Sequence, residues 1–381
     1  MTSQPPAPSP DRPTLADLTT LRVGGPVAHY VEATSEDELV AAVRAADEAG
    51  TPLLVLGGGS NVLAADAGFA GTVVRDARRG IVGQADSACA GAAVTVPAGH
   101  PWDDVVAEAV EQGWMGVEAL AGIPGSTGAT PVQNVGAYGQ EVAETLSSVR
   151  VWDRARSRVR MLAVGELGLG YRTSLLKRSL VADDAGRAWG PTPRYVVLEV
   201  SFQLRLATLS APVRYAELAR TLGVEVGARV PAHEVRTAVL QLRRGKGMVL
   251  DADDADTWSA GSFFTNPVLA TGEADRLLPP DAPRFPVVEH QRVRSVDGKV
   301  PAVEGLVKTS AAWLITRAGF DKGHGLPGPA SLSTKHPLAL TNRGGAAAED
   351  VLAVAREVRD GVRARFGIDL VPEPVLVGLT L

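Results

Sequence analysis

The sequence of 381 residues lacks the features that mark several large classes of protein. Cysteine occurs once, at Cys89, which excludes an intrachain disulfide and any metal site built from several cysteines. No apolar run approaches the roughly 18 residues that a membrane helix needs. The net charge is −5, and lysine and arginine are scattered rather than gathered in a stripe with aromatic residues. We therefore expect a cytoplasmic protein with no metal ion and no nucleic-acid or membrane partner.

The start of the chain, MTSQPPAPSPDRP, is rich in proline and has neither the basic start nor the apolar core of a signal peptide. Residues 1–13 are predicted to be a disordered tail. The remaining length is enough for two or three domains. Mixed strand and helix signals predict a two-part α+β cofactor domain, followed by a second α+β unit from residue 211.

Glycine, in contrast, is abundant, and much of it lies in two loops about sixty residues apart. One loop runs through Gly57, Gly58 and Gly59, and the other lies between Gly116 and Gly139, a stretch without lysine or arginine. Glycine exposes main-chain N–H groups and allows backbone to approach a ligand closely. The G-x-G-x-x-G fingerprint of dinucleotide-binding folds fails at Val62, and no phosphate-binding P-loop motif occurs. The pair of loops therefore predicts one extended cofactor, held from two sides.

Apolar periodicity and end signals predict the main elements. Ser35 and Glu38 form a capping box that starts a helix ending near Gly50. Strands are predicted over 26–33, 52–56, 71–75, 93–97, 149–153, 159–163 and 195–204. Helices are predicted over 102–112, 231–244, 305–318 and 349–366, the last closed by Gly367.

Several isolated patterns offer chemistry, and each has an ordinary alternative. Arg172 follows a tyrosine and offers a planar cation to a carboxylate or phosphate, or else makes a structural ion pair. Ser262 beside two phenylalanines can donate a proton, or lies in a buried turn. Glu373 lies between two prolines in an apolar segment, where burial would keep its carboxyl protonated, or else it faces water. Residues 333–336 are polar lining or plain surface.

These motifs occur in the order found in the UDP-N-acetylenolpyruvoylglucosamine reductase family, which the sequence resembles from about Thr20 to Gly378. The matching segments are 56–63, 121–139, 170–177, 261–267, 333–342 and 372–373. The resemblance implies an α+β fold with a two-part FAD-binding domain of the vanillyl-alcohol-oxidase (PCMH) type, residues 14–80 and 81–210. A C-terminal α+β substrate-binding domain would span 211–381.

The same resemblance implies a function in peptidoglycan synthesis. FAD would be bound noncovalently, NADPH would reduce it, and UDP-N-acetylglucosamine enolpyruvate would be the substrate, with the chain acting as a monomer. The cofactor-binding positions implied are Gly57, Gly58, Gly59, Ser60, Asn61, Ile123, Pro124, Gly125, Ser126, Thr127, Gly128, Ala129, Tyr138 and Gly139.

Three residues match the family's catalytic positions. Ser262 would protonate the α-carbon, Arg172 would hold the substrate carboxylate, and protonated Glu373 would donate a hydrogen bond to the developing enolate. The substrate-binding positions implied are Tyr215, Lys246, Asn266 and His336. Tyr215 marks the branch of the family with the longer loop. Segments 183–194 and 251–256 depart from the compact pattern and are expected to be surface insertions.

Two other functions stay open at this point. Oxidases and dehydrogenases of the same flavin fold often attach FAD to histidine or cysteine, and neither residue occurs in either glycine loop. A nonenzymatic nucleotide-sugar sensor would have no use for a proton donor, so the joint presence of Arg172, Ser262 and Glu373 argues against it.

Overall fold

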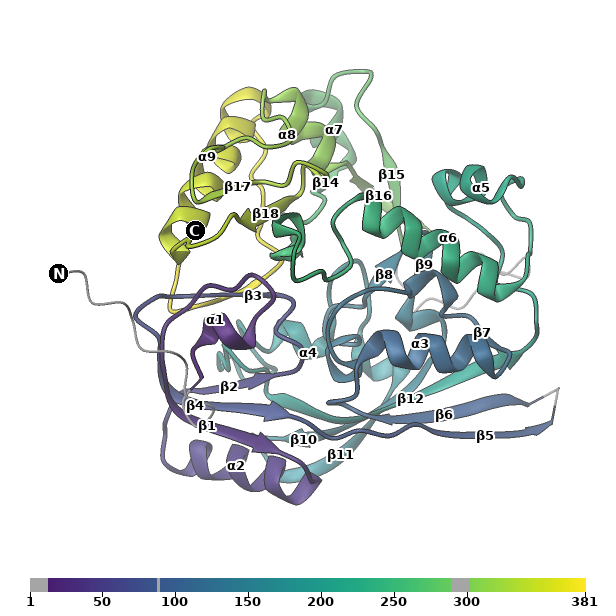
Figure 1. Ribbon diagram of the computed structural model, residues 1–381, viewed down its shortest axis with the longest axis vertical. Coiled ribbons are helices and arrows are strands. Elements are labelled where there is room, and N and C mark those ends of the chain that lie inside the picture. The colour runs from purple at the N-terminus through teal and green to yellow at the C-terminus, as the bar shows by residue number, and fades with distance from the viewer. Residues whose placement is uncertain (1–12, 88–89, 289–301) are drawn as a thin grey trace.

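A computed structural model describes residues 13–87, 90–288 and 302–381 of the chain (Figure 1). The predicted N-terminal tail lies outside the described residues except for Pro13, and so does Cys89.

The first part of the chain folds into a parallel sheet in the order β1-β4-β2, with one long helix against it. Its elements are α1 (Leu15–Leu18), β1 (Val27–Ala33), α2 (Glu36–Glu48), β2 (Leu53–Leu56), β3 (Val62–Ala64) and β4 (Phe69–Asp76). The predicted capping box is confirmed, because Ser35 Oγ accepts from the Glu38 N–H at 3.2 Å and Glu38 Oε2 accepts from the Ser35 N–H at 3.3 Å. The glycines at 57–59 lead into strand β3 and not into a helix, consistent with the missing dinucleotide fingerprint.

The second part is an antiparallel sheet in the order β11-β10-β12-β6-β5, with β7 paired to β12. Its strands are β5 (Val82–Ser87), β6 (Gly91–Pro97), β7 (Trp114–Met115), β10 (Leu146–Asp153), β11 (Arg158–Ala163) and β12 (Tyr195–Leu206). The connections carry α3 (Trp102–Glu111), α4 (Leu175–Arg178) and the short pair β8 (Gly136–Ala137) and β9 (Gln140–Glu141). Helices α5 (Ala216–Leu222) and α6 (Ala232–Gly245) share one hydrophobic core with this sheet, through Leu218, Val235 and Val239 among others. The division at residue 210 therefore stays a proposal.

The C-terminal part forms two small sheets, in the orders β13-β18-β17 and β14-β16-β15, around the long helix α9. Its elements are β13 (Ser259–Ser262), β14 (Val268–Ala270), α7 (Thr271–Leu277), β15 (Phe285–Val288), β16 (Ala302–Lys308), α8 (Ala311–Arg317), β17 (Ala330–Leu332), β18 (Ala339–Asn342), α9 (Ala348–Phe366) and β19 (Val375–Val377). Helix α9 ends at Gly367 with a φ of 69°, as predicted.

The helix predicted over 305–318 is wrong in its first half. Residues Ala302–Lys308 form strand β16, which pairs with β14 and β15, and Gly305 has a φ of 77° that an α-helix excludes. The helix begins only after Ser310, whose side chain accepts from the Trp313 N–H. The predicted helix runs through Ser310, which is in fact the N-cap of the helix. Ser310 therefore separates strand β16 from helix α8.

The end of the chain returns to the first domain. Strand β19 pairs in parallel with β3, and the Val375 N–H donates to the Asn61 carbonyl at 3.0 Å. Figure 1 shows this yellow segment descending from the C-terminal part to β3. Glu373 is thereby carried next to the first glycine loop.

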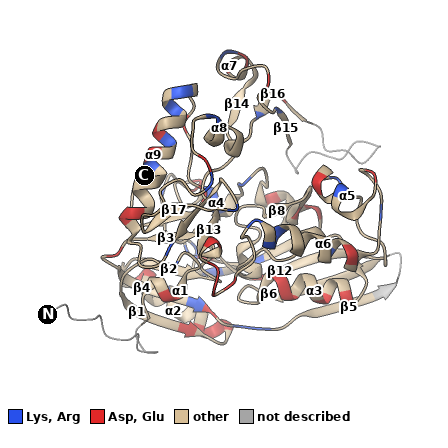
Figure 2. Cartoon of the chain, turned by 45° about the horizontal axis from the view of Figure 1, so that its top comes forward, with Lys and Arg blue, Asp and Glu red and all other residues tan. Residues whose placement is uncertain are grey.

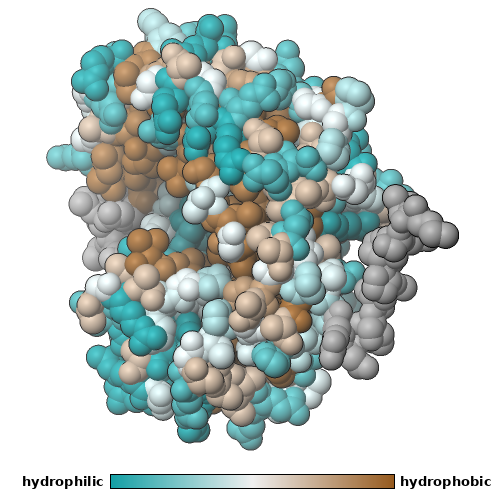
Figure 3. Space-filling view, turned by 90° about the vertical axis from the view of Figure 1, so that its left-hand side faces the viewer, coloured by the Kyte–Doolittle hydropathy of each residue, from teal (hydrophilic) through white to brown (hydrophobic). Residues whose placement is uncertain are grey.

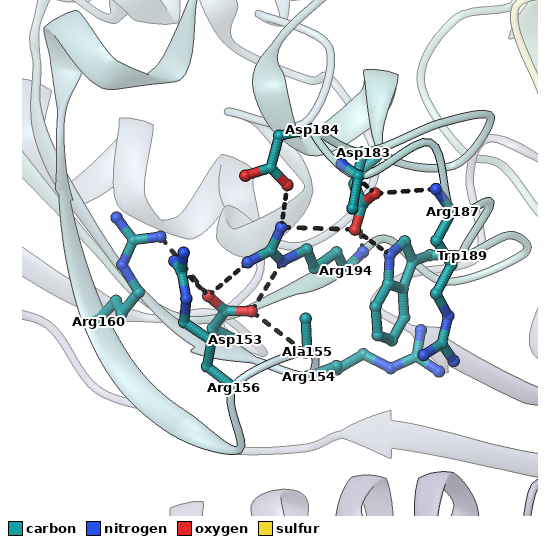
Figure 4. Close-up of polar contacts among 12 residues, drawn as sticks. Asp153, Arg154, Ala155, Arg156, Arg160, Asp183, Asp184, Arg187, Trp189 and Arg194 are labelled. Carbon is teal, nitrogen blue, oxygen red and sulfur yellow. Dashed lines mark hydrogen bonds and ion pairs between the residues drawn. The ribbon is translucent and has the colours of Figure 1, made fainter.

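The segment 183–194 is more than a surface insertion. Arg194 is 3% exposed and forms two contacts with the fully buried Asp153, Nε to Oδ1 at 2.8 Å and Nη2 to Oδ2 at 3.1 Å (Figure 4). Trp189 is buried and donates to Asp183, which also pairs with Arg194. The second expected insertion, 251–256, is also tied down, because Asp256 is 4% exposed and accepts from the Thr334 N–H at 2.8 Å. Residues 184–188 and 251–253 are exposed, so the expectation of surface segments holds for about half of each, but each segment also contains buried residues that anchor it.

Charged residues of both signs are interspersed over the elements (Figure 2). Among the described residues, no helix has the length and apolar character needed to cross a membrane.

Candidate active site

The two glycine loops touch each other. Ser60 Oγ donates to the Pro124 carbonyl at 2.9 Å, and a Cβ at Gly58 would lie 2.7 Å from the Gly125 Cα. A Cβ at Gly57 would lie 1.9 Å from Ser126 Oγ. Glycine is favoured at these positions because Gly58 packs against the main chain of the second loop and Gly57 packs against the Ser126 side chain.

Together the loops form one wall of a cavity of about 280 Å³. The cavity continues along β2 at one end and reaches the C-terminal part at the other. Its lining includes Leu56, Gly57, Gly58, Gly59, Ser60, Asn61, Ile123, Pro124, Ser126, Ala129, Gln133, Arg172, Leu180, Pro191, Pro193, Arg243, Ser262 and Glu373. Figure 3 shows hydrophobic residues gathered around the hollowed middle of one face of the molecule.

Other predicted cofactor positions, which are not part of the cavity lining, fix the conformation of the second loop. Thr127 is fully buried, and its hydroxyl donates to the His100 carbonyl at 2.9 Å. The Gly128 N–H donates to the Ala98 carbonyl at 2.9 Å, where a Cβ would lie 2.4 Å from the Ala98 Cβ. Gly125 has a φ of 119°, which only glycine adopts readily.

Arg172 and Glu373 form an ion pair at the cavity. Arg172 Nε lies 3.1 Å from Glu373 Oε1, and the two side chains are 23% and 10% exposed. Burial by itself would lower the pKa of Arg172, but the adjacent Glu373 carboxylate outweighs it and raises that pKa above its usual value. Arg172 itself has a φ of 52°, a backbone conformation that non-glycine residues rarely adopt and that is frequent at functional sites.

Ser262 ends strand β13 opposite Ala339 of β18 and lines the same cavity. The Glu373 N–H donates to the carbonyl of the next residue, Phe263, at 2.8 Å. Serine and glutamate, which come from segments far apart in the chain, are thereby fixed side by side. Glu373 is 8% exposed, so the alternative of a water-exposed glutamate is wrong.

A second group of predicted residues lies together outside that lining. The rings of Tyr138 and Tyr215 meet edge to face at 5.6 Å, and Lys246 Nζ lies 5.6 Å from the Tyr138 ring centroid. Lys246 also pairs with Glu217 at 2.5 Å. Burial raises the pKa of Tyr138 to about 12. A Cβ at Gly139 would lie 2.8 Å from the Arg214 Cβ, so glycine lets this turn approach the segment that carries Tyr215.

His336 and Asn266 complete the predicted substrate positions. Burial, reinforced by the nearby Lys246, lowers the pKa of His336 to about 4, so its imidazole is neutral at neutral pH. Asn266 accepts from the Ala311 N–H at 3.0 Å through Oδ1, at the start of α8, and its own N–H donates to the Tyr171 hydroxyl at 3.2 Å. Asn266 therefore also fixes the geometry of the loop after Ser262.

Three polar residues of the site are not among the predicted site residues. Arg243 lines the cavity, and its Nε is buried without a hydrogen-bond partner among the described residues. Burial lowers the pKa of Arg243 to about 10, which still leaves it charged at neutral pH. Gln133 and Lys177 lie at Glu373. Their signals were present, since Arg243 stands in the same basic run as Lys246 and Gln133 lies in the second glycine stretch.

The cavity fits an extended anionic cofactor. Its walls offer main chain and neutral side-chain donors from two glycine loops. The guanidinium of Arg243 supplies a positive charge at the cavity: its Nη2 donates to the Met248 carbonyl at 2.7 Å, and its Nε has no partner among the described residues. FAD, with its pyrophosphate between two aromatic ring systems, matches this donor set.

Two regions of the chain match models of known families. Residues 27–162 match the FAD binding domain, and residues 253–377 match the UDP-N-acetylenolpyruvoylglucosamine reductase, C-terminal domain. The predicted fold class, an FAD-binding domain of the PCMH type with a C-terminal α+β domain, is confirmed.

Relatives extend the likeness over nearly the whole chain. It is 53% identical over 374 residues to the UDP-N-acetylenolpyruvoylglucosamine reductase of Thermobifida fusca, covering 96% of this chain and 97% of that protein. It is 56% identical over 371 residues to the enzyme of the same name from Saccharopolyspora erythraea, covering 96% and 95%. Among solved structures, the UDP-N-acetylenolpyruvylglucosamine reductase of Thermus caldophilus superimposes with a TM-score of 0.59 at 25% identity, covering 96% and 98%.

Proposed function

The chain belongs to the UDP-N-acetylenolpyruvoylglucosamine reductase family, and from that premise we propose how its own residues carry out the reaction. As a member, it is an FAD-dependent oxidoreductase of peptidoglycan precursor synthesis that takes its reducing equivalents from NADPH. The reaction reduces the enolpyruvyl double bond of UDP-N-acetylglucosamine enolpyruvate and yields UDP-N-acetylmuramate. When bound, FAD supplies the hydride that is added at the β-carbon of that double bond.

Three side chains divide the remaining chemistry. Arg172 holds the substrate carboxylate through its guanidinium. Glu373 forms an ion pair with Arg172 in the structure, so this role requires that it take up a proton in the substrate complex. It would then donate a hydrogen bond to the enolate oxygen that develops as the α-carbon becomes electron-rich. The Ser262 hydroxyl then gives its proton to the α-carbon, which completes the addition of one hydride and one proton across the double bond.

The observation that carries this proposal is a convergence. Arg172, Ser262 and Glu373 come from three distant segments, yet all of them line the cavity that both glycine loops enclose. Tyr215, Lys246 and His336 gather beyond it, where a cation, two aromatic rings and a neutral imidazole suit a nucleotide diphosphate. We propose that these residues, with Asn266, bind the nucleotide part of the substrate.

The decisive experiment separates the two half-reactions by flavin absorbance without oxygen. NADPH should bleach the flavin of the purified protein, and UDP-N-acetylglucosamine enolpyruvate should then restore its colour with formation of UDP-N-acetylmuramate. Bleaching without recovery would refute the proposed substrate while leaving the FAD domain in place. Precipitation with acid should release all of the flavin, because the proposal holds FAD noncovalently.

We propose that the protein acts as a monomer in the cytoplasm. Catalytic and cofactor positions of this chain converge on one cavity without a second copy, and a single cysteine suits a reducing compartment. Sedimentation at micromolar concentration should give the mass of one chain, 39.6 kDa plus FAD. A concentration-independent dimer would overturn this part of the proposal.

A further inference from the structure

Gln133 connects the first glycine loop to the proposed acid. Its Oε1 accepts from Asn61 Nδ2 at 3.0 Å and from Lys177 Nζ at 3.2 Å. Its Nε2 donates to Glu373 Oε1 at 2.9 Å. Asn61 and Lys177 both lie 3.4 Å from the Glu373 carbonyl oxygen as donors, so main chain and side chain of Glu373 belong to one polar cluster.

The two donors on Oε1 fix which way the Gln133 amide points. Turning the amide over would place its NH₂ group against the Lys177 ammonium and the Asn61 NH₂, and its oxygen against the Glu373 carboxyl oxygen. The contacts with Asn61 and Lys177, which both present N–H donors, would then be repulsive. The Gln133 NH₂ therefore has to face Glu373.

This arrangement treats the two oxygens of Glu373 differently. Oε1 receives the Gln133 hydrogen bond and lies 3.1 Å from Arg172 Nε. No residue of the described chain donates to Oε2, although Glu373 lines the cavity. One carboxyl oxygen is held by the protein and the other is left for the ligand.

We propose that Gln133 is a positioning residue, which occupies Oε1 of Glu373 and so presents Oε2 as the oxygen that carries the proton toward the substrate. The inference rests on the proposed function, in which Glu373 donates a hydrogen bond to the enolate. Lys177 acts one step further back, because its ammonium helps to hold the Gln133 amide in the required orientation.

The first test is the variant Gln133→Leu, followed in the two half-reactions. Flavin reduction by NADPH should keep its rate, and oxidation by UDP-N-acetylglucosamine enolpyruvate should slow about tenfold, the order expected for one lost hydrogen bond. Gln140→Leu is the matched control. Gln140 likewise accepts through its amide oxygen and donates to a carboxylate, that of Glu118, but it lies outside the cavity lining. Slowing of the same step by Gln140→Leu would overturn the inference.

A double-mutant cycle with Glu373→Gln tests whether Gln133 acts through Glu373. If it does, Gln133→Leu should add almost no further slowing in the Glu373→Gln background, because the two changes then remove one function. Independent, multiplying effects would overturn the inference and leave the role of Glu373 intact. A fast oxidative half-reaction in Glu373→Gln alone would overturn the proposed role of Glu373 together with the inference.

A second variant covers failure of Gln133→Leu to fold or to bind FAD. Gln133→Glu keeps an oxygen that accepts from Asn61 and Lys177, but it loses the donor to Glu373. FAD content should match the wild type, oxidation by substrate should slow, and a crystal structure should show the Glu373 carboxyl turned away from its Oε1 contact. An unchanged oxidation rate with an unmoved carboxyl would overturn the inference.

Discussion

Ser60 donates a hydrogen bond to the Pro124 carbonyl at 2.9 Å and so joins the two glycine loops to each other. The contact makes one rigid wall from segments that are distant in sequence. The cofactor is therefore expected to meet a wall that exists before it binds, and little ordering free energy is lost on binding.

Gly58→Ala should weaken FAD binding. Its Cβ would lie 2.7 Å from the Gly125 Cα, an atom of the main chain, so the loops have to move apart, at a cost of about 1–3 kcal/mol. We expect a raised FAD dissociation constant, measured by reconstitution of the stripped protein and fluorescence quenching. Gly165→Ala is the control, because nothing lies within 4 Å of its Cβ position. Equal FAD affinity in both variants would mean that the two loops can move apart at no cost to FAD binding.

Ser262→Ala should slow only the oxidative half-reaction, by ~10²–10⁴-fold, because a general acid typically contributes that much. Flavin bleaching by NADPH should stay as fast as in the wild type. Ser331→Ala provides the control, since Ser331 is a fully buried serine of β17 in the same sheet and outside the cavity lining. Equal slowing of both half-reactions would rule out a role for Ser262 as proton donor.

Local signals predicted most of the regular elements, because the capping box at Ser35 and the cap at Gly367 are written in neighbouring residues. The failure over 305–318 has a physical reason. A short strand paired on both sides gains its hydrogen bonds from distant segments, and nothing local in Ala302–Lys308 reveals those partners.

The site divides in the same way. The glycine loops and the three proposed catalytic residues were found from motifs, whereas Gln133 and Lys177 acquire their meaning only when β19 brings Glu373 next to Asn61. Arg194 is the clearest case. Its partner Asp153 ends a strand 41 positions away, so a segment that looked like a surface insertion also carries one half of a buried ion pair. Pro191 and Pro193 of the same segment line the cavity.

His336→Gln tests the neutral imidazole. Burial and the cations Lys246, Lys322 and Arg243 lower its pKa from 6.5 to about 4, against a smaller opposing effect of Glu217. The unfolded chain therefore binds a proton first as pH falls, so His336 costs stability progressively between about pH 6.5 and pH 4. Urea unfolding of His336→Gln should lose less stability over this range than the wild type does. If both lose the same amount, His336 is not held neutral by the fold.

The KM for the enolpyruvyl substrate offers an independent check on His336. The His336 imidazole stays neutral above about pH 5, so the wild-type KM should not change near pH 6.5. The pH dependence of KM should therefore be the same in the wild type and in His336→Gln over this range. A step near pH 6.5 that His336→Gln abolishes would mean that the imidazolium, and not the imidazole, contacts the substrate.

Arg194→Met should destabilise the protein strongly at neutral pH and less in acid. Burial alone would raise the pKa of Asp153, but the hydrogen bonds from Arg194 outweigh it and hold that pKa below its usual value. The pair therefore contributes its full stability above the unfolded pKa of about 3.9 and loses it as pH falls through the lower folded pKa. Without Arg194, the buried Asp153 keeps only the longer ion-pair contacts with Arg156 and Arg160, each at 3.5 Å, so the change should cost at most about 3–5 kcal/mol at pH 7.

The comparison of two pH values separates charge from packing in that variant. The difference in unfolding free energy between wild type and Arg194→Met should shrink at acid pH, where Asp153 takes up a proton, whereas a loss of packing would be the same at both pH values. Arg44→Met is the control, because the Arg44 and Glu48 side chains are 54% and 71% exposed and such pairs contribute little.

The Val55 N–H donates to Thr192 Oγ1 at 2.7 Å, which connects the segment that carries Arg194 to the cavity strand β2, so Arg194→Met should also release FAD more readily. Unchanged FAD affinity in a destabilised Arg194→Met protein would show that the pair of Arg194 and Asp153 supports the fold alone.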